Sequence, residues 1–299
     1  MRSKLLLISL LASFRLSGFS QGYVNYDYLT SSSLKDKDGN KYGESNLQRI
    51  SGRYTIPLSR TMNESKQPTG WSMTLAASYG MMDNRDGAQD WNPDRILNAS
   101  LSVAHVRPLS ERWSLIASLG GGIYASPDEV SWQSLLASGA FIFVYRVRDN
   151  FSVGVGGGVT NSYGIPIVMP MGYLSWRTNG QYEVLINMSD ALKVQVSTHF
   201  GKNVRMQLTA MEMDGMSAVM RVDGRQKLYS SVMISSGLNV SYRLFGKASV
   251  YAGVGGMWLR TTDITDRSLK SFFKSFGDDN DELSFAPSLR LSVGLRYGF

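Results

Sequence analysis

The chain has 299 residues, a formal net charge of +7 and no cysteine. Without cysteine it can form neither a disulfide scaffold nor a thiolate metal site. Its basic residues do not form runs interleaved with aromatics, which argues against a nucleic-acid surface, and its motifs predict no cofactor.

The N-terminus has the layout of a secretory signal peptide. Arg2 and Lys4 precede the apolar run at 5–12, and small residues follow up to Ser20, after which we expect cleavage. Arg15 shortens the apolar run, and an amphipathic membrane anchor is the alternative. Removal of residues 1–20, with three of the 31 basic residues, leaves 28 basic and 24 acidic residues. The rest of the sequence contains no run of 18 apolar residues, the length that would predict a transmembrane helix. We therefore expect the exported chain in the periplasm or the outer membrane.

Residues 21–299 alternate between apolar and polar or small side chains with a period of two, which is typical of strands with one apolar face. In "GWSMTLAASYGM", residues 70–81, every second residue from Trp71 is apolar, and most residues between are small. We predict fourteen strands, with twelve as the alternative because 211–227 is ambiguous and could extend a hairpin above the membrane. The predicted strands lie near 23–28, 49–58, 70–81, 95–107, 113–125, 135–148, 151–160, 170–178, 181–188, 191–200, 203–212, 228–244, 248–262 and 283–299.

The connections between these strands alternate between tight and long. Outer-membrane barrels have short periplasmic turns and longer external loops, so residue 21 is expected to start in the periplasm. Two connections depart from this rule: "RTMNESKQPTG" is long for a periplasmic turn, and "SD" at 189–190 is short for an external loop.

Two all-β architectures fit alternating strands, a membrane barrel and a soluble β-sandwich. A sandwich would expose Lys and Glu on its polar face, whereas here that face is mostly Ser, Gly, Thr and Ala. Aromatic residues, such as Trp71, Trp113, Trp258 and Tyr297, lie near strand ends as interfacial girdles do. The sequence therefore predicts a closed antiparallel transmembrane β-barrel, porin-like, in the outer membrane of a Gram-negative bacterium, with the lipid bilayer as its direct partner.

The last strand, "APSLRLSVGLRYGF", resembles the assembly signal of bacterial outer-membrane proteins through Tyr297 and Phe299. That resemblance implies recognition by the barrel-assembly machinery. The motifs "PLSERWSLIASLGGG", "FIFVYRVRDNFSVGVGGGV" and "YGIPIVMPMGYLSWR" resemble an uncharacterised outer-membrane barrel family filed as a domain of unknown function. The family supplies no activity.

When the apolar positions face lipid, nine basic residues face the lumen, against Asp27 and Glu183. The nine are Arg49, Arg53, Arg146, Arg148, Lys193, Arg205, Arg243, Arg290 and Arg296. A charge facing lipid near the midplane would cost about 2–4 kcal/mol, and a basic lumen concentrates anions. In the alternative, these residues pair with loop acids such as Asp278 and Glu282, or form rim charges at strand ends, and select no solute.

Two further features bear on the lumen. Seven glycines face inward by this alternation: Gly120, Gly122, Gly154, Gly156, Gly158, Gly253 and Gly255. They could leave room in the lumen for a solute or for the segment "NSYGIPIVMP". In the alternative, they relieve the curvature of the barrel strands. In the long loop 261–282, "DRSLKSFFKSF" has helical apolar spacing, suited to a constriction or to a cap on the rim.

The function hypothesis is a passive channel or uptake route for small solutes, anionic or amphiphilic. The alternative is a non-conducting barrel with a structural or partner-binding role. A barrel-embedded lipid enzyme is a remote third option, because it needs a nucleophile and a base. The two histidines, His105 and His199, lie in no such constellation and make a weak metal pair, so we predict no enzyme.

Overall fold

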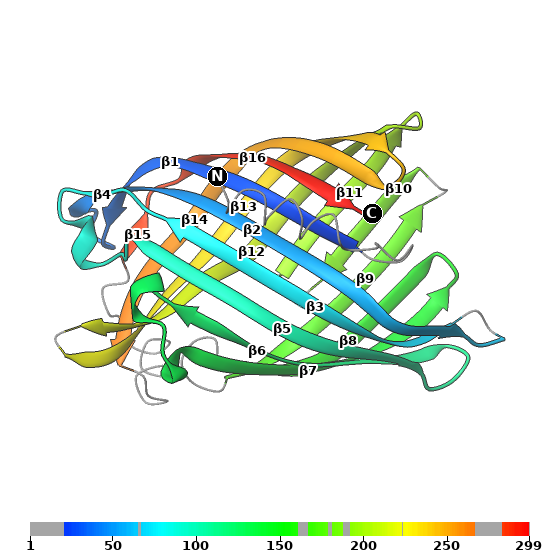
Figure 1. The fold of residues 1–299 in the computed structure, drawn as a ribbon. Helices are drawn as coiled ribbons and strands as arrows, with labels where there is room; N and C mark the ends of the chain where they lie inside the picture. Colours follow the sequence, from blue (N-terminus) through cyan, green and yellow to red (C-terminus); the bar gives the residue numbers. More distant parts are fainter. Residues whose placement is uncertain are drawn as a thin grey trace, which may run out of the picture.

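The computed structural model is a closed antiparallel β-barrel (Figure 1). It describes residues 21–64, 67–160, 167–178, 181–187, 192–222, 224–266 and 283–298. The barrel strands are β1 (Gln21–Lys35), β2 (Lys41–Met62), β3 (Pro68–Met81), β5 (Arg95–Pro108), β6 (Trp113–Ala125), β7 (Leu135–Arg148), β8 (Phe151–Thr160), β9 (Ile167–Thr178), β10 (Tyr182–Asn187), β11 (Leu192–Phe200), β12 (Val204–Val222), β13 (Arg225–Phe245), β14 (Ala248–Asp266) and β16 (Ser288–Tyr297). Two short strands, β4 (Asn84–Arg85) and β15 (Leu283–Phe285), join the same sheet.

The ring closes between the two ends of the chain. Strand β16 lies between β1 and β14, with Tyr297 paired to Gly22 on one side and to Ala248 on the other. The described residues therefore form a 14-stranded ring with two additional short strands, and the predicted closed barrel is confirmed. Closure leaves no open sheet edge in lipid, where unpaired N–H and C=O groups are costly.

The two ends of the barrel differ in their connections. The termini and the tight turns share one end, here called the inner end, which is the periplasmic end in outer-membrane barrels. The connection expected to be a long periplasmic loop is instead mostly strand, because β2 and β3 stay paired as far as Met62 and Pro68. Likewise β12 and β13 stay paired out to Val222 and Arg225, through the region left ambiguous by the sequence.

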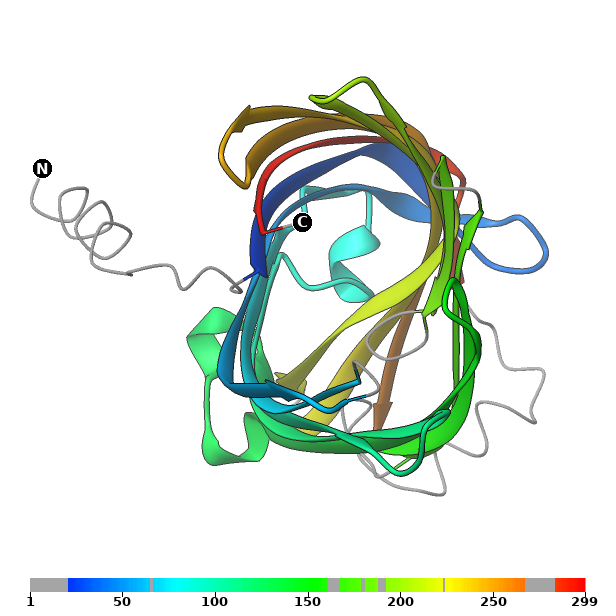
Figure 2. The same ribbon diagram turned by 90° about the vertical axis from the view of Figure 1, so that its right-hand side faces the viewer.

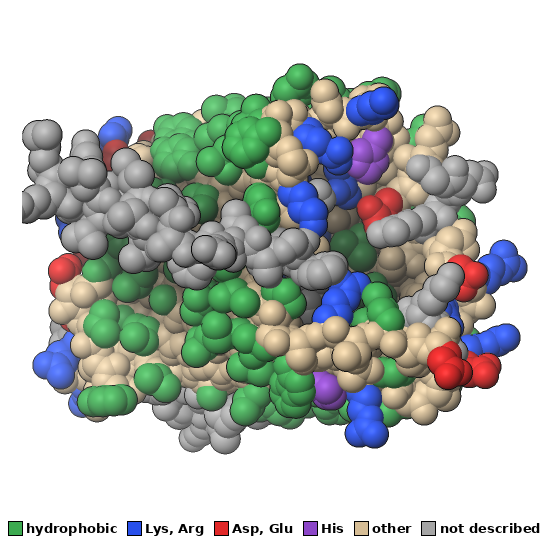
Figure 3. All heavy atoms as spheres, turned by 45° about the vertical axis from the view of Figure 1, so that its right-hand side comes forward, with side chains coloured by type: hydrophobic (Ala, Val, Ile, Leu, Met, Phe, Trp, Pro, Cys, Tyr) green, Lys and Arg blue, Asp and Glu red, His purple; other side chains and the backbone are tan. Residues whose placement is uncertain are grey.

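The outer surface carries a band of apolar side chains (Figure 3). Leu119, Val155 and Val168 are 73%, 70% and 77% exposed, as expected for side chains that face lipid tails. Aromatic residues, including Trp71, Trp113 and Trp176, lie on this surface near strand ends. An apolar band on a closed barrel identifies an outer-membrane protein.

In the part of the chain that the structure describes, no helix is long and apolar enough to cross a membrane.

Strands β12 and β13 do not follow the wall at their outer ends. The segments 213–222 and 224–231, here together called the inward hairpin, cross the lumen, as the yellow strands in Figure 2 show. Val219 of β12 pairs in parallel with Ala125 of β6, six strands away around the wall, and Asn98 Nδ2 of β5 donates to the Ser217 carbonyl at 2.6 Å. The hairpin therefore rests on the opposite wall.

The largest apolar core of the described residues lies inside the outer half of the barrel. It joins the wall to the inward hairpin and consists of Leu29, Leu47, Met82, Ile96, Met216, Ala218, Tyr229, Met233 and Met257. The Tyr229 hydroxyl donates to Asn92 Oδ1 at 2.7 Å, in the connection that follows β3. Hydrophobic packing thus fills one side of the outer lumen, where a wide porin would hold water.

Candidate functional site: the barrel lumen

A β-bulge places two carboxylates in the lumen. In β12, Gln207 and Thr209 are buried on the inner face, and the pairing with β11 then skips Ala210. The extra residue moves the following side chains to the opposite face. Glu212 and Asp214 therefore point inward, although simple alternation from Gln207 would have turned them toward lipid.

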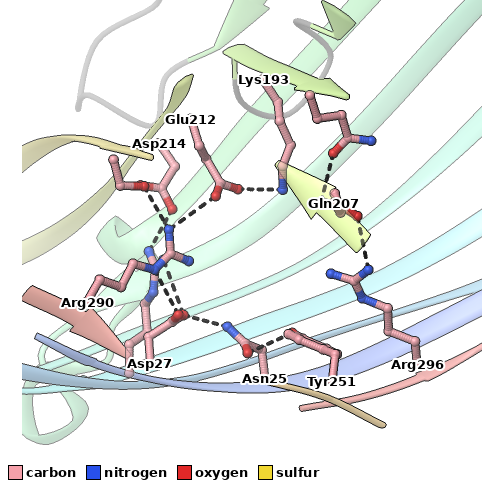
Figure 4. A network of polar contacts seen from close by, with 12 residues as sticks. Asn25, Asp27, Lys193, Gln207, Glu212, Asp214, Tyr251, Arg290 and Arg296 are labelled. Carbon is pink, nitrogen blue, oxygen red and sulfur yellow. Dashed lines mark hydrogen bonds and ion pairs between the residues drawn. The ribbon is translucent and has the colours of Figure 1, made fainter. Parts of the chain in front are cut away.

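Six charged side chains inside the barrel are connected by ion pairs and are here called the charge layer; Figure 4 labels five of them. Its members are Asp27, Arg49, Lys193, Glu212, Asp214 and Arg290. The Asp27 side chain is 0% exposed and accepts from Arg290 Nε at 2.9 Å, with Arg49 Nη2 at 3.6 Å. Arg290 also lies 3.2 Å from Glu212, which receives Lys193 Nζ at 2.8 Å.

The charge layer is neutral, because its three bases face three acids. Arg49 of β2 reaches across the lumen to Asp214 of the inward hairpin, with Nη1 2.7 Å from Oδ2. Charges withdrawn from water need such partners, since an uncompensated buried charge is strongly destabilising. The pairs therefore hold the hairpin base against the wall, and they leave little free charge for a solute at this level.

Below the charge layer lies an open space of about 710 Å³, here called the inner chamber. Its wall runs from Gln21 and Gly298 at the inner rim up to the charge layer. Arg296 stacks over the Tyr251 ring at 4.1 Å and donates to Gln207 Oε1 at 3.2 Å. Arg205 donates to Ser197 Oγ at 2.8 Å and lies 3.3 Å from Glu183. The chamber is therefore polar and ordered along its wall.

A second space of about 440 Å³, here called the side cavity, lies between the inward hairpin and strands β5 to β9. Small residues form its wall on β5 to β7: Ser100, Ser102, Ser118, Gly120 and Ser138. Longer apolar residues face them: Met169, Met171, Leu192, Met213 and Met216. Arg53, Asn98, Tyr124 and Asp214 line both spaces, so the side cavity and the inner chamber adjoin.

The nine predicted basic residues divide into two groups. Six of them line the inner chamber: Arg49, Arg53, Lys193, Arg205, Arg290 and Arg296. The other three lie at the inner ends of their strands and outside both spaces. Arg146 donates to the Glu111 carbonyl in a turn, Arg148 is exposed beside its turn, and Arg243 is exposed near the end of β13. Period-two counting gives the face of a strand but not the depth along it, so it does not separate these three residues from the other six.

The inward glycines permit close contact between strands. A methyl group on Gly156 would lie 1.9 Å from the Phe141 carbonyl oxygen, and one on Gly255 would lie 2.0 Å from that of Ser236. A Cβ cannot fit at such distances. These glycines let the wall strands coil tightly, and Gly120 and Gly158 also border the side cavity.

The two histidines lie far from the charge layer. His105 stacks on Trp71 with ring centroids 4.2 Å apart, and its Nδ1 lies 3.1 Å from the Gly70 carbonyl oxygen. His199 is exposed next to the turn after β11. Within the described ranges, no group of three or more His, Asp or Glu side chains is arranged to hold a metal ion.

Several predicted features lie outside the described residues. These are the signal peptide at 1–20, Phe299 of the assembly signal, most of the loop 261–282 with Asp278 and Glu282, and the first part of "NSYGIPIVMP". Among the described residues, Arg49, Arg205 and Arg290 pair with acids on the strands. Asp27, Glu183, Glu212 and Asp214 are their partners.

The chain is similar to several solved outer-membrane barrels. It resembles the COG4313 outer membrane channel from Pseudomonas putida F1 with a TM-score of 0.47, 8% identity, and coverage of 93% of this chain and 94% of that one. It resembles the NanC porin with a TM-score of 0.38, 7% identity, and coverage of 93% and 100%. It resembles the KdgM porin in complex with disordered oligogalacturonate with a TM-score of 0.32 and 10% identity. That match covers 93% of this chain and 99% of the porin.

No curated protein matches the chain. A family model matches residues 16–298, a range that includes all three motifs on which the resemblance rested. The chain therefore belongs to the uncharacterised family described as "Domain of unknown function (DUF6268)".

Proposed function

We propose that this barrel is a passive route for small solutes, with a preference for anionic ones. The observation that carries the proposal is the pair of adjoining spaces inside the wall. They run from Gln21 and Gly298 at the inner rim, past Arg53, to Val159 and Met169 at the outer ends of β8 and β9. A solute following them passes beside the inward hairpin, without crossing the apolar core.

The preference for anions follows from the charges below the charge layer. That layer is neutral, so the remaining charged residues of the chamber set its sign. They are Arg53, Arg205 and Arg296 against Glu183, a surplus of two positive charges. A cavity with low-dielectric walls focuses such a surplus and raises the local concentration of anions.

A flux assay tests this proposal. Proteoliposomes are loaded with benzenesulfonate or with phenyltrimethylammonium, which are matched in size and opposite in charge, and efflux is compared with that from empty liposomes. We expect efflux above the empty-liposome rate, and faster for the anion. Efflux equal to that of empty liposomes, or faster efflux of the cation, would contradict the proposal.

The apolar core in the outer lumen is the one observation that favours the alternative, a non-conducting barrel with a structural or partner-binding role. The same assay separates the two, because a closed barrel gives no efflux of either ion.

Delivery to the membrane forms part of the proposal. Residues 1–20 would direct export, and the C-terminal strand would be recognised by the barrel-assembly machinery. In support, Tyr297 lies in the strand that closes the ring. Deletion of Phe299 is expected to lower the amount of folded barrel in the outer membrane; unchanged assembly would contradict this role.

A further inference from the structure

The side cavity has two contrasting walls. The wall on β5 to β7 consists mainly of serines and glycines. The opposite wall, on β9 and β12, supplies four methionines, Met169, Met171, Met213 and Met216. Methionine is unbranched and polarisable, so such a wall adapts to flexible apolar chains. The volume of about 440 Å³ lies within the range of small-molecule sites.

The outer end of the side cavity lies at Val159 of β8 and Met169 of β9. Met169 alternates with Val168, which is 77% exposed and faces lipid, so the Met169 side chain faces the lumen. Strand β12 runs along its other border. Within the described residues, β11 pairs with β12 only as far as Met213, and β12 then crosses to β6. The inward hairpin therefore forms this border of the side cavity.

The opposite end of the side cavity is polar and basic. Arg53, Asn98 and Tyr124 lie where it adjoins the inner chamber. An apolar groove that ends at an arginine matches a molecule with an apolar tail and a negative head. A fully hydrophilic anion would leave the methionines without contacts, and an uncharged lipid would gain nothing from Arg53.

We propose that the side cavity binds a single-chain amphiphile with one anionic head group. The tail lies between the methionines and the serine wall, and the head lies near Arg53. This inference rests on the proposed solute route and names the class of molecule for which its outer portion is shaped.

Methionine methyl NMR tests the proposal directly. The full-length barrel is labelled with [ε-¹³C]methionine, placed in lipid nanodiscs, and titrated with decanoate at pH 8. We expect saturable shifts of the Met169, Met171, Met213 and Met216 methyl resonances. Met73, on the lipid-facing side of β3, and Met62, in the hairpin beyond the inner end, serve as controls. Shifts confined to Met73, or no saturable shift, would overturn the proposal.

Two variants sharpen the result. Ser118→Phe fills the cavity and is expected to abolish the four shifts, and Ser138→Leu replaces it if the first variant does not fold. Arg53→Gln is expected to raise the Kd of decanoate about fivefold, the effect of losing one partly exposed charge contact, while the Kd of decyl maltoside stays within about twofold. Equal weakening for both amphiphiles would contradict a head group at Arg53.

This experiment and the flux assay fail independently. Efflux of benzenesulfonate without binding of decanoate would contradict the amphiphile site and support the solute route. Saturable decanoate binding without efflux would contradict the solute route and support the binding site.

Discussion

The two sides of the lumen are built differently. On the side of β12 to β14 and β1 to β2, buried apolar side chains and neutral charge pairs fill the interior, as Tyr229, Met233 and Asp27 illustrate. On the side of β5 to β9, serines and glycines leave a space of about 440 Å³. One side therefore fixes the inward hairpin, and the other leaves a cavity beside it. The difference teaches that a hairpin across the centre of a barrel need not fill its whole lumen.

The largest expected effect is on the filled side. Tyr229→Ala removes a side chain that is 2% exposed and leaves Asn92 without its hydroxyl donor. Truncating a buried aromatic residue costs about 3–5 kcal/mol. Urea unfolding in lipid vesicles, followed by gel mobility of unheated samples, should show a loss of about 4 kcal/mol. A loss below about 1 kcal/mol, typical of surface positions, would mean that the outer lumen is not a packed core.

The charge layer should give the next largest effect. Asp27→Asn keeps the side-chain volume but leaves Arg49 and Arg290 without this carboxylate. We expect a loss of about 3 kcal/mol, the lower end of the range for a broken buried pair, because Asp214 and Glu212 remain. The matched control is Glu183→Gln, because the Glu183 pair with Arg205 at 3.3 Å is more exposed. This variant should lose about 1 kcal/mol or less in the free energy of unfolding. Equal losses would contradict the distinction between the layer and the chamber wall.

On the open side, substitutions at close contacts between wall strands should lower the free energy of unfolding more than substitutions that project into the side cavity. Gly156→Ala places a methyl group 1.9 Å from the Phe141 carbonyl oxygen. The strands must shift to admit it, which corresponds to an overpacking cost of about 1–3 kcal/mol. The control is Gly121→Ala, where the nearest heavy atom to the added methyl would lie 3.4 Å away. If both variants unfold at the same urea concentration, the close strand contact at Gly156 is not required.

The smallest stability effect should come from filling the side cavity. Ser118→Phe projects a ring into existing space, so we expect the free energy of unfolding to change by less than about 0.5 kcal/mol, as at ordinary surface positions. Flux of benzenesulfonate should nevertheless fall to the rate of empty liposomes. A variant with normal stability and unchanged flux would show that solutes do not use this side.

The fold was largely predictable, because a membrane barrel imposes period-two alternation on every strand and closure on the whole sheet. The site was only partly predictable. Asp27, Arg49 and Arg290 follow from alternation alone. Glu212 and Asp214 do not, since the bulge at Ala210 shifts the phase of β12 without any mark in the local composition.

The inward hairpin could not be derived from the pattern of a single strand. Residues 216–220, "MSAVM", are apolar at neighbouring positions, which indicates contacts on both faces. That signal does not say which wall supplies the contacts. The crossing depends on partners distant in sequence, such as Asn98 and Ala125, and only the assembled barrel brings them together.

The central claim is that solutes pass beside a hairpin that stays in place. The chain has no cysteine, so Gln133→Cys with Gln226→Cys introduces a unique pair at the hairpin tip, where Gln226 Nε2 donates to Gln133 Oε1 at 2.7 Å. A short thiol-specific cross-linker then tethers the hairpin outside the side cavity, and benzenesulfonate efflux is measured before and after reductive cleavage. The account predicts the same rate in both states. A rate that falls on cross-linking and recovers on cleavage would show that the hairpin must move, and would contradict the claim.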